Sequence, residues 1–122
     1  MKAIKIDAEN QKIVFVEVSS DYKDIYVQLG LGCDIMTAPI ILENEDTVYV
    51  DDEGLLRGPA KCGWTMSLSD GTFWKFVGNG LILGSNDEGE SAPAKSTIEE
   101  IATMVGWMNE EAAKLYQYEI GF

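Results

Sequence analysis

Alternating apolar and polar residues predict two β-strands at the start of the chain. Residues 2–6 alternate in the order Lys-Ala-Ile-Lys-Ile, and residues 13–18 are rich in the β-branched side chains that pack well on a pleated surface. The polar segment 7–12 between them has the length of a hairpin loop. We therefore expect the chain to open with two paired strands.

A helical spacing of apolar residues follows the second strand. The positions i, i+3, i+4 and i+7 are held by Tyr22, Ile25, Tyr26 and Leu29. Ser19 or Ser20 can cap the first turn, and Gly30 supplies a C-terminal stop. The pattern predicts a short helix over about residues 20–29.

The middle of the chain predicts more strands, at residues 33–42, 47–51, 64–68, 72–76 and 80–84. Pro39 makes the first of them an edge strand, a bulged strand or two pieces, because proline donates no hydrogen bond to a sheet. Asp70-Gly71, between the third and the fourth, is a strong signal for a β-hairpin.

The last quarter of the chain combines a helix start signal with a long apolar stripe. Ser96 and Glu99 match the capping box, in which a serine and a glutamate three residues later cap the first turn. The stripe alternates spacings of three and four through Ile98, Ile101, Val105, Met108, Ala112 and Leu115. We expect one long helix over about residues 97–118, although Gly106 weakens its middle by about 1 kcal/mol relative to alanine.

These elements predict an α+β fold in which residues 1–122 form a single compact acidic domain. The sheet is expected to be mostly antiparallel with five or six strands, and the long C-terminal helix is expected to pack on one face of it. Hydrophobic residues make up 46% of the chain, which is enough to build a core.

The charge of the chain argues against several classes of function. It holds 21 acidic and 9 basic residues, a net charge of −12, and no lysine or arginine from residue 24 to residue 56. Such a surface repels nucleic-acid phosphates and anionic membranes, so we expect no direct nucleic-acid or membrane binding. The N-terminus lacks the apolar run of a signal peptide, and no segment has the roughly 18 apolar residues of a membrane span, which favours a cytoplasmic location.

Two clusters of carboxylates flank the predicted strand 47–51. Together we call them the acidic edge, and its members are Glu43, Glu45, Asp46, Asp51, Asp52 and Glu53. A strand of this length places the two clusters roughly 15 Å apart, at ~3.3 Å per residue. They either bind a partner with a basic surface, as carboxylates that mimic DNA phosphates would, or keep a sheet edge from pairing with other strands.

Aromatic side chains crowd the predicted hairpin, and they are Trp64, Phe73, Trp74 and Phe76. Alternation places Phe73 on one face of the hairpin, and Trp74 and Phe76 on the other. One face belongs in the core. The other face is either covered by a helix or forms a binding surface, for a protein or for a nucleotide-like ligand that stacks on Trp64 and Trp74.

The sequence predicts no catalytic, metal or cofactor site. The missing histidine removes the commonest general base and metal ligand. The acidic turns at residues 51–54 and 87–90 do not match the EF-hand spacing, and the glycines around residues 78–84 lack the lysine of a phosphate-binding loop. Cys33 and Cys62 are expected to be thiols in a reducing compartment. We therefore expect a protein that is not an enzyme.

Three segments carry a resemblance to a known family. They are MKAIKID at the N-terminus, TVYVDDEGLL at residues 47–56 and FVGNGLILG at residues 76–84. In this order, over roughly residues 1–90, the chain resembles the DUF3846 family of small phage and mobile-element proteins of unknown function. The resemblance implies a phage or plasmid setting, and it supplies no catalytic residue, cofactor or activity.

These observations lead to two expected functions. The first is a phage or mobile-element accessory protein that binds a host protein with a basic surface, with an anti-defence or anti-restriction inhibitor as its concrete form. The second is a domain that binds a nucleotide-like small ligand on the aromatic hairpin. The apolar stripe of the last predicted helix could equally serve a homodimer.

Overall fold

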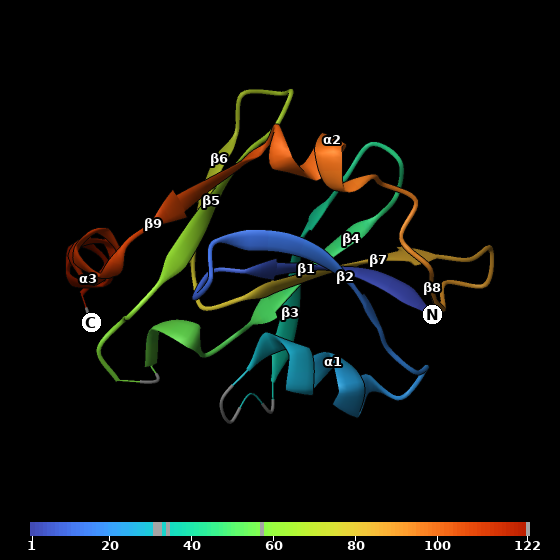
Figure 1. Cartoon of the computed structure of the whole chain (residues 1–122), viewed down its shortest axis with the longest axis horizontal. Coiled ribbons are helices and arrows are strands. Elements are labelled where there is room, and N and C mark those ends of the chain that lie inside the picture. Colours follow the sequence, from blue (N-terminus) through green and yellow to red (C-terminus); the bar gives the residue numbers. More distant parts are fainter. Residues whose placement is uncertain (31–32, 34, 57, 122) are drawn as a thin grey trace.

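The computed structural model describes residues 1–30, 33, 35–56 and 58–121, and it contains two antiparallel sheets that share one core (Figure 1). The strands are β1 (Lys2–Asp7), β2 (Lys12–Glu17), β3 (Met36–Ile41), β4 (Thr47–Asp51), β5 (Gly63–Ser67), β6 (Phe73–Val77), β7 (Gly80–Ser85), β8 (Ser91–Ala92) and β9 (Val105–Met108). The helices are α1 (Tyr22–Leu29), the short 3-10 helix η1 (Gly54–Leu56), α2 (Ile98–Ala102) and α3 (Glu110–Glu119). The expected α+β fold with a mostly antiparallel sheet is confirmed.

The larger sheet has six strands in the order β2-β1-β7-β4-β3, with β8 paired to β7. The first two strands pair along their whole length, as the N-terminal alternation predicts. At the centre, β7 is buried along nearly all its length, because both faces of the sheet are covered. On one face α1 packs over Leu81 and Leu83 through Ile25 and Leu29. The short helix expected near residues 20–29 is therefore confirmed.

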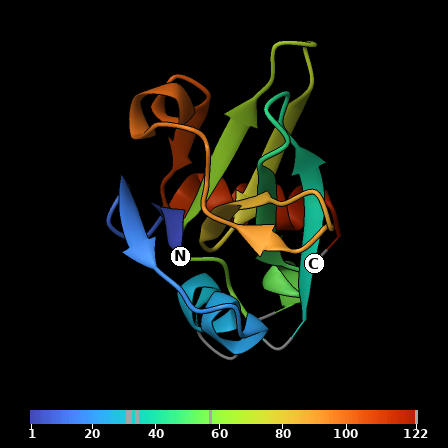
Figure 2. The same cartoon turned by 90° about the vertical axis from the view of Figure 1, so that its right-hand side faces the viewer.

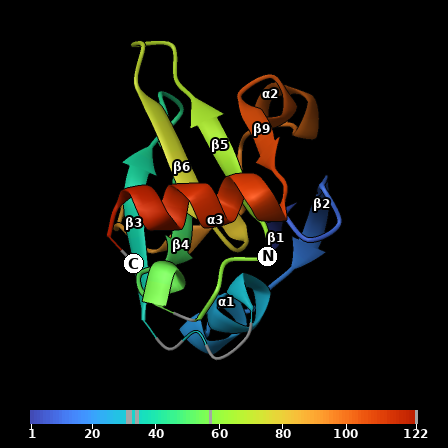
Figure 3. The same ribbon diagram turned by 90° about the vertical axis from the view of Figure 1, so that its left-hand side faces the viewer.

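The smaller sheet has the order β6-β5-β9 and packs against the other face of the larger sheet. Trp64 and Met66 on β5 point inward and are fully buried with Ile4, Ile6 and Ile82 of the larger sheet. Helix α3 crosses the outer side of the smaller sheet (Figure 3). Its Ala113 is buried with Met108, the last residue of β9.

The prediction of one long helix over residues 97–118 is wrong. Helix α2 ends at Ala102, β9 pairs antiparallel with β5, and α3 begins only after its N-cap, Asn109. A Cβ atom at Gly106 would lie 2.6 Å from Thr65 Oγ1, so glycine lets β9 approach β5 closely. Tertiary pairing with β5 overrides the helical spacing, which carries only a weak intrinsic preference.

Of two further expectations, one shifts by a residue and the other is confirmed. The capping box of α2 is formed by Thr97 and Glu100, one residue later than the sequence pattern suggested. Strand β3 is an edge strand whose register with β4 shifts between Thr37 and Ile40, so both the edge and the bulge expected at Pro39 are present. None of the helices in the described residues is long and apolar enough to span a membrane.

Candidate functional site

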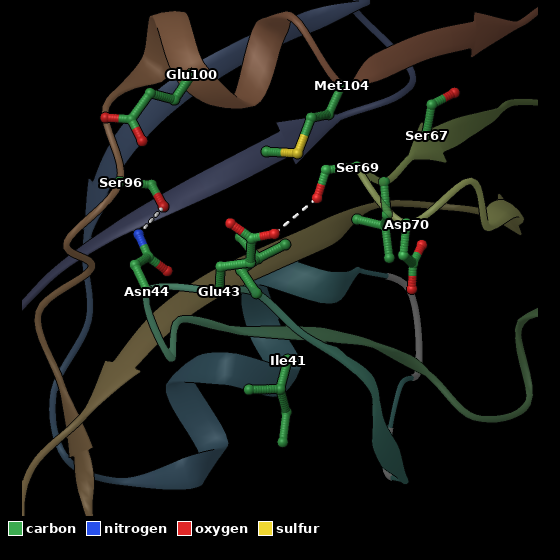
Figure 4. A pocket seen from close by; sticks show the side chains of 11 residues that line it. Ile41, Glu43, Asn44, Ser67, Ser69, Asp70, Ser96, Glu100 and Met104 are labelled. Atoms are coloured by element: carbon green, nitrogen blue, oxygen red, sulfur yellow. Dashed lines mark hydrogen bonds between the residues drawn. The ribbon is translucent and has the colours of Figure 1, made fainter.

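A cavity of about 550 Å³ opens where three segments meet at one end of the molecule. They are the turn between β3 and β4, the tip of the β5–β6 hairpin and helix α2, and Figure 2 shows the turn beside the hairpin tip. We call this cavity the acidic groove, and it is lined by Ile41, Leu42, Glu43, Asn44, Ser67, Leu68, Ser69, Asp70, Ser96, Glu100 and Met104 (Figure 4).

A buried carboxylate fixes one wall of the acidic groove. Asp46 is fully buried, and its carboxylate accepts hydrogen bonds from the backbone N–H groups of Lys95 (3.0 Å) and Ser96 (2.8 Å) and from the Ser96 hydroxyl (2.7 Å). The side-chain amide of Asn44 donates to the same hydroxyl at 2.8 Å. These bonds tie the β3–β4 turn to the segment that enters α2.

The opposite wall is tied by the backbone. The N–H of Ser67, at the end of β5, donates to the carbonyl oxygen of Met104, just after α2, at 2.9 Å. This bond joins the β5–β6 hairpin to the segment after α2. In the same way, Asp46 joins the β3–β4 turn to the segment before α2. All three walls are held by hydrogen bonds within the chain.

Three acidic residues line the acidic groove, one from each of the three segments that meet there. Glu43 accepts a hydrogen bond from the Ser69 hydroxyl at 2.8 Å, which Figure 4 shows crossing between the turn and the hairpin tip. Asp70 accepts from both the N–H (2.9 Å) and the hydroxyl (2.6 Å) of Thr72. Glu100 accepts from Thr97 in the capping box of α2.

Each of these carboxylates accepts its hydrogen bonds through only one of its two oxygens in the described part of the chain. The bonds reach Oε1 of Glu43, Oδ1 of Asp70 and Oε1 of Glu100, while the second oxygen of each carries no hydrogen bond within the described part of the chain. The two bonds from Thr72 also lower the pKa of Asp70, because they stabilise its charged form. The described lining residues include no lysine or arginine.

The floor of the acidic groove is apolar. Leu42, Leu68 and Met104 line it, Ile41 lies at the rim, and Met104 reaches toward Glu43 from the side of α2 (Figure 4). Ile41 is 71% exposed, so its side chain is open to solvent beside the groove. The site therefore combines fixed negative charge with apolar surface.

The six residues of the acidic edge lie in different surroundings in the structure. Its two clusters lie at opposite ends of β4, as expected, but β4 is an inner strand between β7 and β3, so the carboxylates do not guard a sheet edge. Of the six, only Glu43 lines the acidic groove, and Glu45 is exposed beside Lys95 at 3.9 Å. Asp46 cannot meet a partner, because it is buried and bonded within the chain.

The second cluster of the acidic edge lies far along β4 from the first. Asp51 accepts the N–H of Glu53 at 3.0 Å, and Asp52 between them is exposed. Asp51 also lines a second cavity, of about 500 Å³, together with the half-buried Cys62. Burial, and then the charges of Glu9 and Asp7, raise the pKa of the Cys62 thiol, which makes it a poor nucleophile at neutral pH.

The aromatic residues of the hairpin are divided between the core and the surface. Trp64 is fully buried and packs against Phe76, with ring centroids 4.7 Å apart, so it cannot stack on a ligand. Trp74 stacks on the other side of Phe76 at 6.0 Å and is 36% exposed, and Phe73 is exposed on the opposite face. The expected ligand surface therefore loses Trp64 and is split between two faces.

Most of the acidic groove was missed by the sequence patterns. Asp70 was predicted only as a turn residue, and Glu100 and Met104 were placed in a long helix. The hairpin and capping-box signals did locate two of the three walls, but their meeting depends on how the smaller sheet packs on the larger one. Among the described residues, no group of three or more His, Cys, Asp or Glu is placed to hold a metal ion.

Comparison with known proteins identifies a family. A family model described as a domain of unknown function, DUF3846, matches residues 1–112. No curated protein and no solved structure matches the chain.

Proposed function

Since the chain belongs to the DUF3846 family, whose description gives no activity, we propose a function from the geometry of the chain itself. In this proposal it is a non-enzymatic protein whose acidic surface binds a basic surface on a partner protein. The observation that carries this proposal is the acidic groove. It presents three carboxylates held in place by the fold, with no lysine or arginine in its described lining.

The charge of the whole chain supports the same partner. A net charge of −12 attracts a basic protein over a distance set by salt screening, which speeds encounter. Fixed carboxylates at the groove then favour cationic side chains over neutral ones. The exposed apolar side chain of Ile41 adds contact area at the rim.

The mobile-element setting implied by the family resemblance would make the partner a host protein in the cytoplasm. A DNA-binding defence protein is the concrete candidate, because its DNA-binding face is basic and a carboxylate-rich surface competes for that face. In this form the chain acts as an anti-defence or anti-restriction inhibitor.

The test compares two charge-reversed proteins of equal net charge. The groove variant carries Glu43→Lys, Asp70→Lys and Glu100→Lys, and the control carries Asp87→Lys, Glu111→Lys and Glu119→Lys at exposed positions away from the groove. Each is used as bait in a host lysate, and captured proteins are purified for affinity measurements at low and high salt.

We expect the groove variant to lose captured proteins that the unmodified chain and the control retain. Those proteins should have basic surfaces, and their affinity should fall as salt rises. The proposal fails if groove and control variants capture the same proteins equally. Circular dichroism of both variants shows whether each has folded.

A further inference from the structure

The smaller sheet ends in a strand whose outer side is unpaired. Strand β6 pairs with β5 in unbroken register along its whole length, and no other strand in the described residues pairs with it. Figure 3 shows β6 at one side of this sheet and β9 at the other. An edge strand of this kind exposes backbone N–H and C=O groups that can pair with another chain.

The bonds between β5 and β6 identify the free backbone groups of β6. The N–H of Gly78, just after β6, donates to the carbonyl oxygen of Cys62 at 3.1 Å. Alternate residues along an antiparallel strand bond to the same neighbour, so the even-numbered residues of β6 bond to β5. The N–H and C=O groups of Phe73 and Lys75 therefore point away from β5. Among the described residues, no hydrogen bond reaches any of these groups.

The larger sheet protects its outer strands, and β6 lacks the same protection. In β3, Pro39 removes an N–H and the register shifts beside it, and β2 contacts α2. Strand β6, all of whose residues are described, contains no proline and no register shift. Its one charged residue, Lys75, lies over the ring of Tyr116 on α3, with Nζ 5.5 Å from the ring centroid. The amine is thus held on the outer face of the sheet, where it leaves the edge accessible.

Exposed aromatic rings flank the free groups on both faces of the sheet. Phe73 is 57% exposed on the outer face. Trp74 is 36% exposed on the inner face, where it stacks on Phe76 with ring centroids 6.0 Å apart. A strand added beside β6 places its own side chains within reach of both rings. Aromatic side chains in such positions are frequent anchors of protein interfaces.

Both ends of the open edge carry acidic residues. Asp70 lies in the turn that leads into β6. At the other end, a Cβ atom on Gly54 would lie 3.0 Å from the carbonyl oxygen of Val77, so η1 covers the last residue of β6. Glu53 directly precedes η1. An extended segment on this edge therefore meets negative charge near both of its ends.

These charges disfavour a second copy of the chain as the occupant. Two β6 edges related by a two-fold axis pair antiparallel, which brings the Asp70 end of one copy against the Glu53 end of the other. Like charges then meet at both ends, and each copy has a net charge of −12. A segment with apolar residues in its middle and a basic residue near each end is complementary to the edge instead.

On these grounds we infer that the outer side of β6 binds an extended segment of the basic partner protein, which adds to the smaller sheet as a further strand. The backbone of the segment bonds to Phe73 and Lys75. Its alternate side chains contact the rings of Phe73 and Trp74, and its basic side chains lie near Asp70 and Glu53. This inference rests on the proposed function, because it names how the basic partner attaches.

The experiment measures amide hydrogen exchange of the ¹⁵N-labelled chain by NMR, with the blocked peptide acetyl-Arg-Thr-Val-Thr-Val-Thr-Arg-amide as the probe. Without peptide, the amides of Phe73 and Lys75 should exchange fast, and those of Trp74 and Phe76 slowly, because only the latter bond to β5. Saturating peptide should slow exchange at Phe73 and Lys75 about tenfold or more and leave Trp74 and Phe76 unchanged.

Three altered peptides test the mode of binding. A peptide with glutamate in place of both arginines should bind about tenfold more weakly at low salt. Two further peptides carry N-methyl groups either on all threonines or on both valines. Because alternate amides of a strand point to opposite sides, one of these two should lose binding and the other should keep it. Equal binding of the two N-methylated peptides overturns the inference.

A pair of variants at one position tests the edge itself. Lys75→Pro removes an N–H that faces outward and is not used by the β5–β6 ladder, whereas Lys75→Ala keeps it. The peptide should protect Phe73 in Lys75→Ala and not in Lys75→Pro. Equal protection overturns the inference, and if Lys75→Pro does not fold, the N-methylated peptides decide. Protection of Phe73 and Lys75 that grows with chain concentration, without peptide, assigns the edge to a second copy and also overturns it.

The same pair separates this inference from the proposed function. Lys75→Pro and Lys75→Ala are used as bait beside the groove variant. If both capture the same basic proteins while the groove variant loses them, the partner binds at the acidic groove alone and only the assignment of β6 is wrong. If neither the groove variant nor Lys75→Pro changes what is captured, the proposed function fails as well.

Discussion

The carboxylate of Asp46 and the backbone N–H of Ser96, 50 positions apart in the chain, form a fully buried hydrogen bond of 2.8 Å. The same carboxylate accepts the Ser96 hydroxyl and the N–H of Lys95. This single side chain joins the β3–β4 turn to the start of α2 and so defines one corner of the acidic groove.

Replacing Asp46 by alanine should cost about 3 kcal/mol in free energy of unfolding. The change leaves the donors of Lys95 and Ser96 buried without an acceptor, and hydrogen bonds to a charged group contribute about 1.5–3 kcal/mol each. Urea unfolding at neutral pH measures the change as a shift of midpoint.

Asp52→Ala is the matched control for that experiment. Asp52 carries the same charge on an exposed turn, so its loss should change stability by no more than about 0.5 kcal/mol. Equal losses for the two variants would show that Asp46 contributes only charge and not the described bonds.

Gly106→Ala should destabilise the protein by about 1–3 kcal/mol, because the new Cβ would lie 2.6 Å from Thr65 Oγ1. In a continuous helix the same change would instead stabilise by about 1 kcal/mol. The sign of the change in unfolding free energy therefore distinguishes the strand β9 from a helix.

A double-mutant cycle with Thr65→Ala tests the cause of that effect. Removing the Thr65 hydroxyl gives the new methyl group room, so Gly106→Ala should cost less in the Thr65→Ala background than alone. Additive losses would place the strain elsewhere.

Thr72→Ala should raise the pKa of Asp70 toward its ordinary value of 3.8, since it removes the hydroxyl that donates to this carboxylate at 2.6 Å. The pKa of Asp70 is lowered in the folded protein, so its contribution to stability is present above the unfolded pKa. That contribution is lost as pH falls below 3.8 and through the folded value. Carboxyl ¹³C NMR follows the titration directly, and an unchanged Asp70 curve in the variant would refute the assigned cause.

Cys62 should react slowly with iodoacetamide at pH 8, and faster in a Glu9→Gln variant. Burial comes first among the causes that raise its pKa above 9.0, followed by the charges of Glu9 and Asp7, so little thiolate is present. Mass spectrometry of the Cys62 peptide gives the rate, and the urea-unfolded chain serves as reference. The raised pKa also means that the folded state loses stability relative to the unfolded chain as pH rises past 9.0.

The strands were predictable because alternation, a β-branched run and an Asp-Gly turn each report local preference. The last segment was not, because the spacing of Ile101, Val105 and Met108 fits a helix as well as it fits a turn followed by a strand. What decides between them is the edge of β5 opposite β6, with which residues 105–108 pair. That information lies some forty residues earlier in the chain and has no local signature.

The acidic groove shows the same limit at the level of single residues. Glu45 and Asp46 are adjacent carboxylates in one turn, yet the first is exposed and the second fully buried. The positive φ of 72° at Glu45 turns the chain there. Composition predicts a negative surface, but the backbone of the turn decides which carboxylate is exposed.

The bonds that hold the walls of the acidic groove also have a kinetic consequence. Because Asp46, Ser69 and the Ser67–Met104 backbone bond hold the turn, the hairpin tip and the helix in the folded chain, the groove is formed without any bound partner. Little chain entropy remains to be lost at the moment of association. For the proposed basic partner, the on-rate should then follow diffusion and the salt-dependent attraction between opposite charges, and differences among candidate partners should lie in how long each one stays bound.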